Sequence, residues 1–151
     1  MDVTHRPARV EDVSEVLAFW ASAAEDQHRP ADSADAIARL VERDAEALWL
    51  AVADGRIVGS VIVGWDGWRC HVYRLAVHPD WRRRGVASGL LSLAEDRFVA
   101  VGGSRADAMV LDENVSAHAA WAATGYARQP EWSRWVKTLP PLRPGRPGPA
   151  A

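Results

Sequence analysis

The spacing of apolar side chains divides the first third of the chain into a strand and two helices. A short strand is expected at residues 3–6. Between residues 10 and 24, apolar residues recur every three or four positions, which predicts an amphipathic helix. Asp32 or Ser33 can cap a second helix, whose apolar positions fade into an acidic stretch after residue 41.

The middle of the chain has the pattern of a three-stranded antiparallel meander. The expected strands are residues 48–53, 57–65 and 69–77. Asp-Gly pairs at residues 54–55 and 66–67 separate them, and such pairs favour tight hairpin turns. The chain therefore returns twice on itself within 30 residues.

Helices and strands alternate in the last third. A helix is expected at residues 85–100, ending at Gly102-Gly103, and a strand within residues 105–114. Asn114 can cap a short helix that runs to residue 123, and residues 131–139 alternate like a final strand. The order β-α-α-β-β-β-α-β-α-β predicts an α/β fold, in which a mixed sheet carries helices on both faces.

Composition narrows the class of protein. The 151 residues suit one domain, expected at residues 1–139, and the Pro/Gly-rich residues 140–151 are expected to be disordered. A net charge of −2 argues against a nucleic-acid-binding protein. With one cysteine and no apolar run near 20 residues, we expect a cytoplasmic protein with no disulfide, no metal and no membrane partner.

The densest positive charge stands where a strand gives way to a helix, in the stretch HPDWRRRGVASGLL at residues 78–91. The first N–H groups of a helix lack internal partners and lie at the positive end of its dipole. Glycine lets the backbone approach a ligand closely, and guanidinium groups add charge that suits a pyrophosphate. The alternative is a solvated Arg-rich loop, because neither common glycine-rich phosphate motif is present.

Two motifs in this order and at this distance resemble the GNAT (Gcn5-related N-acetyltransferase) superfamily, in its small single-domain bacterial form. The run RRRGVA at residues 82–87 matches its [Q/R]-x-x-G-x-[G/A] signature. The segment LDENVSAHAAWAATGYA at residues 111–127 resembles its N-x-x-A-x-x-x-Y-x-x-x-G-F/Y pattern. The likeness covers residues 3–139 and implies a mostly antiparallel sheet of about six or seven strands. It also implies acetyl-CoA as co-substrate and no metal.

The resemblance assigns cofactor contacts to backbone and side-chain groups. An added-strand pairing with the pantetheine arm is implied for Leu75, Ala76 and Val77. Pyrophosphate contacts are implied for Arg82, Arg83, Arg84, Gly85, Val86, Ala87 and Ser88. Positions near the pantetheine and the thioester are implied for Asn114, Ala117 and Trp121. Trp121 departs from the family pattern, because a tyrosine there protonates the leaving thiolate and an indole N–H is too weak an acid for that task.

The candidate catalytic residues are His71 and Tyr73. Histone-type members carry a glutamate base four residues before the first pantetheine-binding residue, and that position here is His71. Strand alternation puts His71, Tyr73, Leu75 and Val77 on one face, and imidazole is a workable base near neutral pH. The alternatives are a surface histidine on a strand and a tyrosine that packs.

The implied reaction is acetyl transfer from acetyl-CoA to a primary amine of a small molecule, peptide or protein. Trp20, Asp66 and Arg69 are candidates for the acceptor pocket, although packing explains the tryptophan and the Asp-Gly turn explains the aspartate. Trp121 also leaves open a non-catalytic acyl-CoA-binding regulatory module. A homodimer formed through residues 131–139 is a further expectation.

Overall fold

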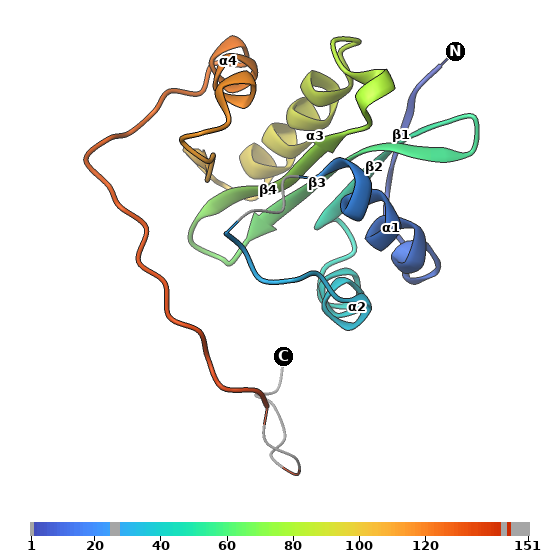
Figure 1. The fold of residues 1–151 in the computed structure, drawn as a ribbon, viewed down its shortest axis with the longest axis horizontal. Helices are drawn as coiled ribbons and strands as arrows, with labels where there is room; N and C mark the ends of the chain where they lie inside the picture. Colours follow the sequence, from blue (N-terminus) through green and yellow to red (C-terminus); the bar gives the residue numbers. More distant parts are fainter. Residues whose placement is uncertain (1, 25–27, 143–144, 146–151) are drawn as a thin grey trace. The chain divides into compact units, whose positions relative to one another are not determined.

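The computed structural model describes residues 2–24, 28–142 and 145. The chain forms two compact units, Met1–Met109 and Val110–Ala151. The first unit holds the sheet and three α-helices, and the second holds one helix and the C-terminal segment. Figure 1 shows the course of the chain through these elements.

The first unit begins with a strand and two helices, as the apolar spacing predicts. Its strands are β1 (Thr4–Pro7), β2 (Leu48–Ala53), β3 (Arg56–Trp65), β4 (Cys70–Val77) and β5 (Ala106–Ala108). Its helices are α1 (Val13–Ala23), α2 (Ala34–Arg43) and α3 (Val86–Ala100), with single 3-10 turns η1 (Val10–Asp12) and η2 (Pro79–Trp81). The second unit contains α4 (Val115–Ala123).

The five strands form one sheet in the order β1-β2-β3-β4-β5. The first four strands pair antiparallel. Hairpin turns join β2 to β3 and β3 to β4, whereas α1 and α2 lie between β1 and β2. β5 pairs parallel with β4, since α3 carries the chain back before β5 begins. Only three residue pairs join β4 to β5, from Cys70↔Ala106 to Val72↔Ala108.

Helices cover both faces of the sheet, as expected (Figure 1). The helices α1 and α2 pack on one face through a cluster that includes Val16, Trp20 and Ile37. The helix α3 packs on the other face, where Val86 and Leu90 lie directly over Gly59. The α/β class is therefore confirmed, and the sheet between the two helical layers carries the candidate site.

Local signals in the sequence form the boundaries that they predict. The Ser33 side chain accepts a hydrogen bond of 3.1 Å from the Ala36 N–H at the start of α2. Gly55 and Gly67 have φ of +72° and +89°, which a glycine adopts without steric cost. Both hairpin turns thus lie where the Asp-Gly pairs stand.

The expected final strand is wrong. Among the described residues the sheet has five strands rather than six or seven, and residues 131–139 lie in no helix or strand. Trp132 and Trp135 in this segment are 72% and 93% exposed. Alternating apolar and polar residues give a segment one apolar face, but a strand also needs a hydrogen-bonded neighbour. No described strand pairs with residues 131–139.

Part of the expected disordered tail lies outside the described residues, namely residues 143–144 and 146–151. The domain boundary at residue 139 stays a prediction. None of the helices in the described ranges has the length and apolar character needed to cross a bilayer.

Candidate functional site

A bulge interrupts β4 in its middle. On β3, Ser60 pairs with Ala76 and Ile62 pairs with Tyr73, so two residues of β4 oppose one residue of β3. Arg74 at this point has φ of +47°, a left-handed conformation that is uncommon for a residue with a side chain. Such bulges bend a strand and redirect its backbone groups.

Beyond the bulge, no strand of the described residues lies along the outer edge of β4. The pairing with β5 ends at Val72, whereas the pairing with β3 continues to Val77. Within the described part of the chain, Leu75, Ala76 and Val77 therefore have a strand on one side only. An edge of this kind presents backbone N–H and C=O groups to an added partner.

The bulge also reverses the alternation of side chains along β4. Tyr73 pairs with Ile62, and Ile62 packs against the α1/α2 cluster, to which Ala76 belongs. The prediction that Leu75 and Val77 share a face with His71 and Tyr73 is therefore wrong, because the extra residue moves Ala76 onto that face. His71 and Tyr73 still lie on one face.

The loop after β4 has an unusual backbone. Arg83 and Gly85 have φ of +62° and +80°. Gly85 occupies the N-cap position of α3. Within the described ranges no side chain caps this helix, and a Cβ at Gly85 would meet no atom within 4 Å. The space at the Cβ position of Gly85 is therefore open, beside a helix start whose N–H groups can suit an anion.

The three arginines of this loop add positive charge just before the start of α3. Arg82, Arg83 and Arg84 are all exposed. Arg82 Nε donates a hydrogen bond of 3.3 Å to the Val77 carbonyl oxygen and so ties the loop to the end of β4. The Arg84 guanidinium lies 5.2 Å from the centre of the Trp81 ring. Val86 points the other way and is 3% exposed, which leaves only its backbone for a ligand.

His71 on β4 contacts an acidic partner on β5. Its Nδ1 lies 2.5 Å from Asp107 Oδ1, and its ring centre lies 5.8 Å from that of Tyr73. The Tyr73 ring covers Gly64, where a Cβ would come within 2.8 Å of Tyr73 Cε2. A histidine with Nδ1 on a carboxylate keeps Nε2 for proton transfer.

Sequence reasoning missed Asp107. The strand in which it lies was expected, but its partner was not, because a parallel pairing across 36 residues leaves no local signal. The register pairs His71 with Asp107 directly, so only the assembled sheet brings the two side chains together.

The candidate acceptor residues have different surroundings. Trp20 is 3% exposed, and its indole N–H is donated to Ser60. Asp66 accepts hydrogen bonds from the backbone N–H groups of Arg69 and Trp68 at 2.7 and 2.8 Å. These two bonds, chiefly that of Arg69, hold the pKa of Asp66 below its ordinary value, as expected for a turn residue.

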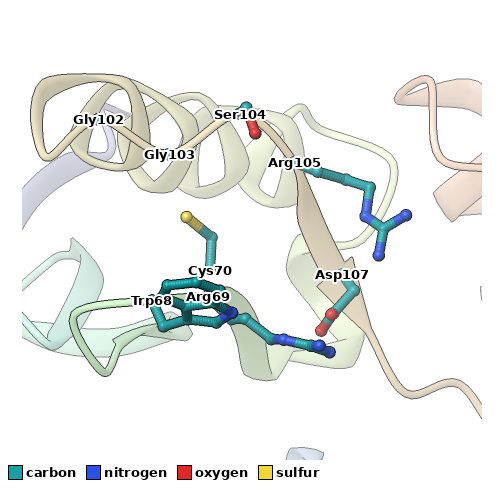
Figure 2. Close-up of a pocket in the computed structure, with 8 residues that line it drawn as sticks. All are labelled: Trp68, Arg69, Cys70, Gly102, Gly103, Ser104, Arg105 and Asp107. Atoms are coloured by element: carbon teal, nitrogen blue, oxygen red, sulfur yellow. The ribbon is translucent and has the colours of Figure 1, made fainter.

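Arg69 lines a hollow of about 370 Å³ at the beginning of β4 and β5. Arg105 and Asp107 line it as well, together with Trp68, Cys70 and residues 102–104 (Figure 2). Burial raises the pKa of the Cys70 thiol, so this cysteine stays protonated and is a poor nucleophile. The hollow thus offers guanidinium groups and one carboxylate rather than a reactive sulfur.

The second unit carries the remaining predicted cofactor residues. Asn114 caps α4, since its Oδ1 accepts a hydrogen bond of 3.2 Å from the Ala117 N–H. The Trp121 ring is half-buried and meets Tyr126 edge-on, with ring centres 4.8 Å apart. Tyr126 therefore packs against the residue that replaces the family's tyrosine.

Comparison with known proteins identifies the class to which this fold and site belong. The profile of the Acetyltransferase (GNAT) family matches residues 12–126. An acetyltransferase of Yersinia pestis (strain Pestoides F) is 38% identical over 105 residues, which cover 69% of this chain and 73% of that protein. The chain belongs to the Acetyltransferase (GNAT) family.

Solved structures agree with this fold. The chain is similar to the PaiA N-acetyltransferase of Thermoplasma acidophilum, solved in complex with coenzyme A, with a TM-score of 0.73 and 16% identity over 85% of this chain and 92% of that one. It is also similar to Ard1 of Thermoplasma volcanium, with a TM-score of 0.72 and 17% identity over 84% of each chain. The chain is thus an acetyl-CoA-dependent acyltransferase.

Among the described residues, no group of three His, Cys, Asp or Glu side chains lies close enough together to hold a metal ion.

Proposed function

We propose that this protein transfers the acetyl group of acetyl-CoA to a primary amine of a small molecule or of a peptide or protein. The observation that carries the proposal is the open edge of β4 beyond its bulge, followed at once by the arginine loop. These features give one strand a place for an extended arm and, at its end, a place for an anion.

The residues present suit coenzyme A. Its pantetheine arm pairs with the backbone of Leu75, Ala76 and Val77 as an added strand. Its pyrophosphate lies at the start of α3, against the backbone of residues 83–88 and the arginine side chains. The open space at Gly85 supports this placement, because a side chain there would fill it. Contacts from Asn114, Ala117 and Trp121 remain predictions from the family pattern.

The chain's own groups account for the proton and charge transfers. His71 Nε2 removes the proton from the acceptor amine, while Asp107 holds Nδ1 and stabilises the resulting imidazolium. The amine nitrogen forms the amide bond to the acetyl carbon, and the carbon–sulfur bond breaks. A backbone N–H of Leu75 or Ala76 faces the thioester oxygen, where negative charge develops. Tyr73 orients His71 by packing.

The departing thiolate takes its proton from water. Trp121 donates hydrogen bonds but releases no proton near neutral pH, and Tyr126 is packed against it. A thiolate is a tolerable leaving group, so the missing acid slows the reaction without preventing it.

The test is a panel of amines incubated with acetyl-CoA, with free coenzyme A thiol as the readout. Small amines, amino acids and peptide N-termini are compared at equal concentration, and acetyl-CoA binding is measured by calorimetry. Turnover with any amine supports the proposal. Micromolar binding without turnover favours the non-catalytic acyl-CoA-binding module that Trp121 suggests. No binding contradicts both.

A further inference from the structure

A chain of two hydrogen bonds connects α1 with the bulge of β4. The Trp20 indole N–H donates to Ser60 Oγ at 2.8 Å. The Ser60 hydroxyl donates in turn to the Arg74 carbonyl oxygen at 2.9 Å. Ser60 is 0% exposed and is the one buried polar residue in the described ranges.

The Arg74 side chain closes the connection from the other direction. Its guanidinium lies 5.1 Å from the centre of the Trp20 ring and forms an ion pair with Asp32, just before α2. The Arg74 side chain is only 7% exposed. Trp20 therefore contacts Arg74 both through Ser60 and through the face of its ring.

The bulge needs such support for two reasons. A residue with a side chain at φ of +47° is strained and persists only where its surroundings hold it. Arg74 also lies where the β3–β4 register shifts, and a backbone carbonyl at such a point needs a hydrogen bond when it is shielded from water. The Ser60 hydroxyl supplies that bond, and Trp20 keeps the hydroxyl pointed at the carbonyl.

We propose that Trp20 and Ser60 are positioning residues that hold the Arg74 bulge, and through it the edge of Leu75 and Ala76, in the geometry that accepts the pantetheine arm. This inference rests on the proposed function, because it concerns the same edge. It also gives Trp20 a different role from the predicted acceptor contact. Trp20 acts on the cofactor side through two hydrogen bonds and touches no substrate.

The experiment compares three variants of the full chain with the parent. Trp20→Phe removes the indole donor and keeps a ring for Arg74. Ser60→Ala removes the hydroxyl, and Ser60→Cys restores a weak donor in nearly the same volume. Val41→Ala is the matched control, because Val41 belongs to the same core cluster but lies on α2, outside the hydrogen-bonded chain.

Two readouts separate positioning from ordinary destabilisation. The first is acetyl-CoA affinity by calorimetry at a temperature where each variant is folded. The second is amide hydrogen exchange of Leu75 and Ala76 without ligand, measured by NMR. We expect Ser60→Ala and Trp20→Phe each to weaken affinity about five- to tenfold and to speed exchange at both amides. Ser60→Cys should recover part of each effect.

The double variant gives the sharpest test, because the effects of the two substitutions on affinity should not add. The double variant Trp20→Phe/Ser60→Ala should bind about as weakly as Ser60→Ala alone, since both changes break one chain. Val41→Ala should lower the melting temperature and leave affinity and exchange at Leu75 unchanged. If the test variants behave as Val41→Ala does, the inference is wrong. If Ser60→Ala does not fold, Trp20→Phe decides by the same readouts.

The two proposals fail in distinguishable ways. If the parent protein binds no acetyl-CoA, the proposed function fails, and the exchange rates at Leu75 and Ala76 still decide whether Trp20 and Ser60 hold the bulge. If the parent binds and exchange is unchanged in both variants, only the positioning role fails.

Discussion

The two halves of β4 belong to one strand and differ in what they offer a ligand. The first half, Cys70–Tyr73, is largely enclosed by β3 and β5 and presents side chains, notably His71 with its partner Asp107. Among the described residues, the second half, Arg74–Val77, has a neighbouring strand on one side only, and its other edge presents backbone groups. Two features make the difference: β5 ends at Ala108, opposite Val72, and the extra residue at the bulge reverses which face the following side chains occupy. One strand thus carries a histidine–carboxylate pair and an open backbone edge side by side, which are the two features on which the proposed function depends.

The largest expected effect follows from changing the first half. His71→Gln should lower turnover about 10²- to 10³-fold, since a general base contributes on that scale, while acetyl-CoA affinity stays within twofold. The measurements are kcat with the best amine and calorimetric Kd. His5→Gln, a change at an exposed histidine on β1, is the control. If His71→Gln loses acetyl-CoA affinity as strongly as it loses turnover, the first half of β4 does not differ in role from the second.

Gly85→Val should weaken the site that follows the second half. A β-branched residue at φ of +80° costs roughly 1–3 kcal/mol, and relief of that strain moves the loop away from the anion. We expect acetyl-CoA affinity to fall about 10- to 100-fold. Gly55→Val is the matched control, because Gly55 also has a positive φ, +72°, and open space around its Cβ position. If Gly55→Val loses as much acetyl-CoA affinity as Gly85→Val, the loss reflects a general effect on folding and not the position of Gly85.

The first half should also be sensitive to packing. A Cβ on Gly103 would lie 2.3 Å from Cys70 Sγ and 2.9 Å from the Phe98 carbonyl oxygen (Figure 2). Gly103→Ala should therefore lower the free energy of unfolding by about 1–3 kcal/mol, as overpacking does. Adding Cys70→Ala should restore part of the lost free energy of unfolding, because it removes the sulfur that the new Cβ meets. Denaturant titration measures the change, and an unchanged midpoint would mean that this corner of the sheet is loosely packed.

The smallest effect concerns the turn that leads into the first half. Hydrogen bonds from the Arg69 and Trp68 N–H groups lower the pKa of Asp66 from its ordinary value of 3.8. A carboxyl with a depressed pKa stabilises the fold above its unfolded pKa and loses that contribution as pH falls through the folded pKa. The stability advantage of the parent over Asp66→Asn should thus shrink below about pH 4. Denaturant unfolding at several pH values between 2 and 6 measures this difference in stability. If the parent's advantage over Asp66→Asn grows toward low pH, the pKa of Asp66 is not lowered in the folded protein.

Local chemistry explains which parts of the fold were predictable. Ser33 and Asn114 cap their helices through bonds to residues three positions away, so a short window contains the whole interaction. The arginine loop was predictable for the same reason, since Gly85 and the start of α3 are adjacent in the sequence. Residues 131–139 show the limit, because their alternation says nothing about which strand, if any, pairs with them.

The sequence by itself determined the order of helices and strands up to α4, the turns between β2, β3 and β4, and the concentration of positive charge in residues 82–84 beside Gly85. These depend on propensity, capping and charge within a few residues. The tertiary structure alone decided the bulge at Arg74, the pairing of His71 with Asp107 and the link from Trp20 to Ser60. Those contacts join residues 14 to 40 positions apart, and their geometry exists only once the sheet has set its register and α1 has packed on it.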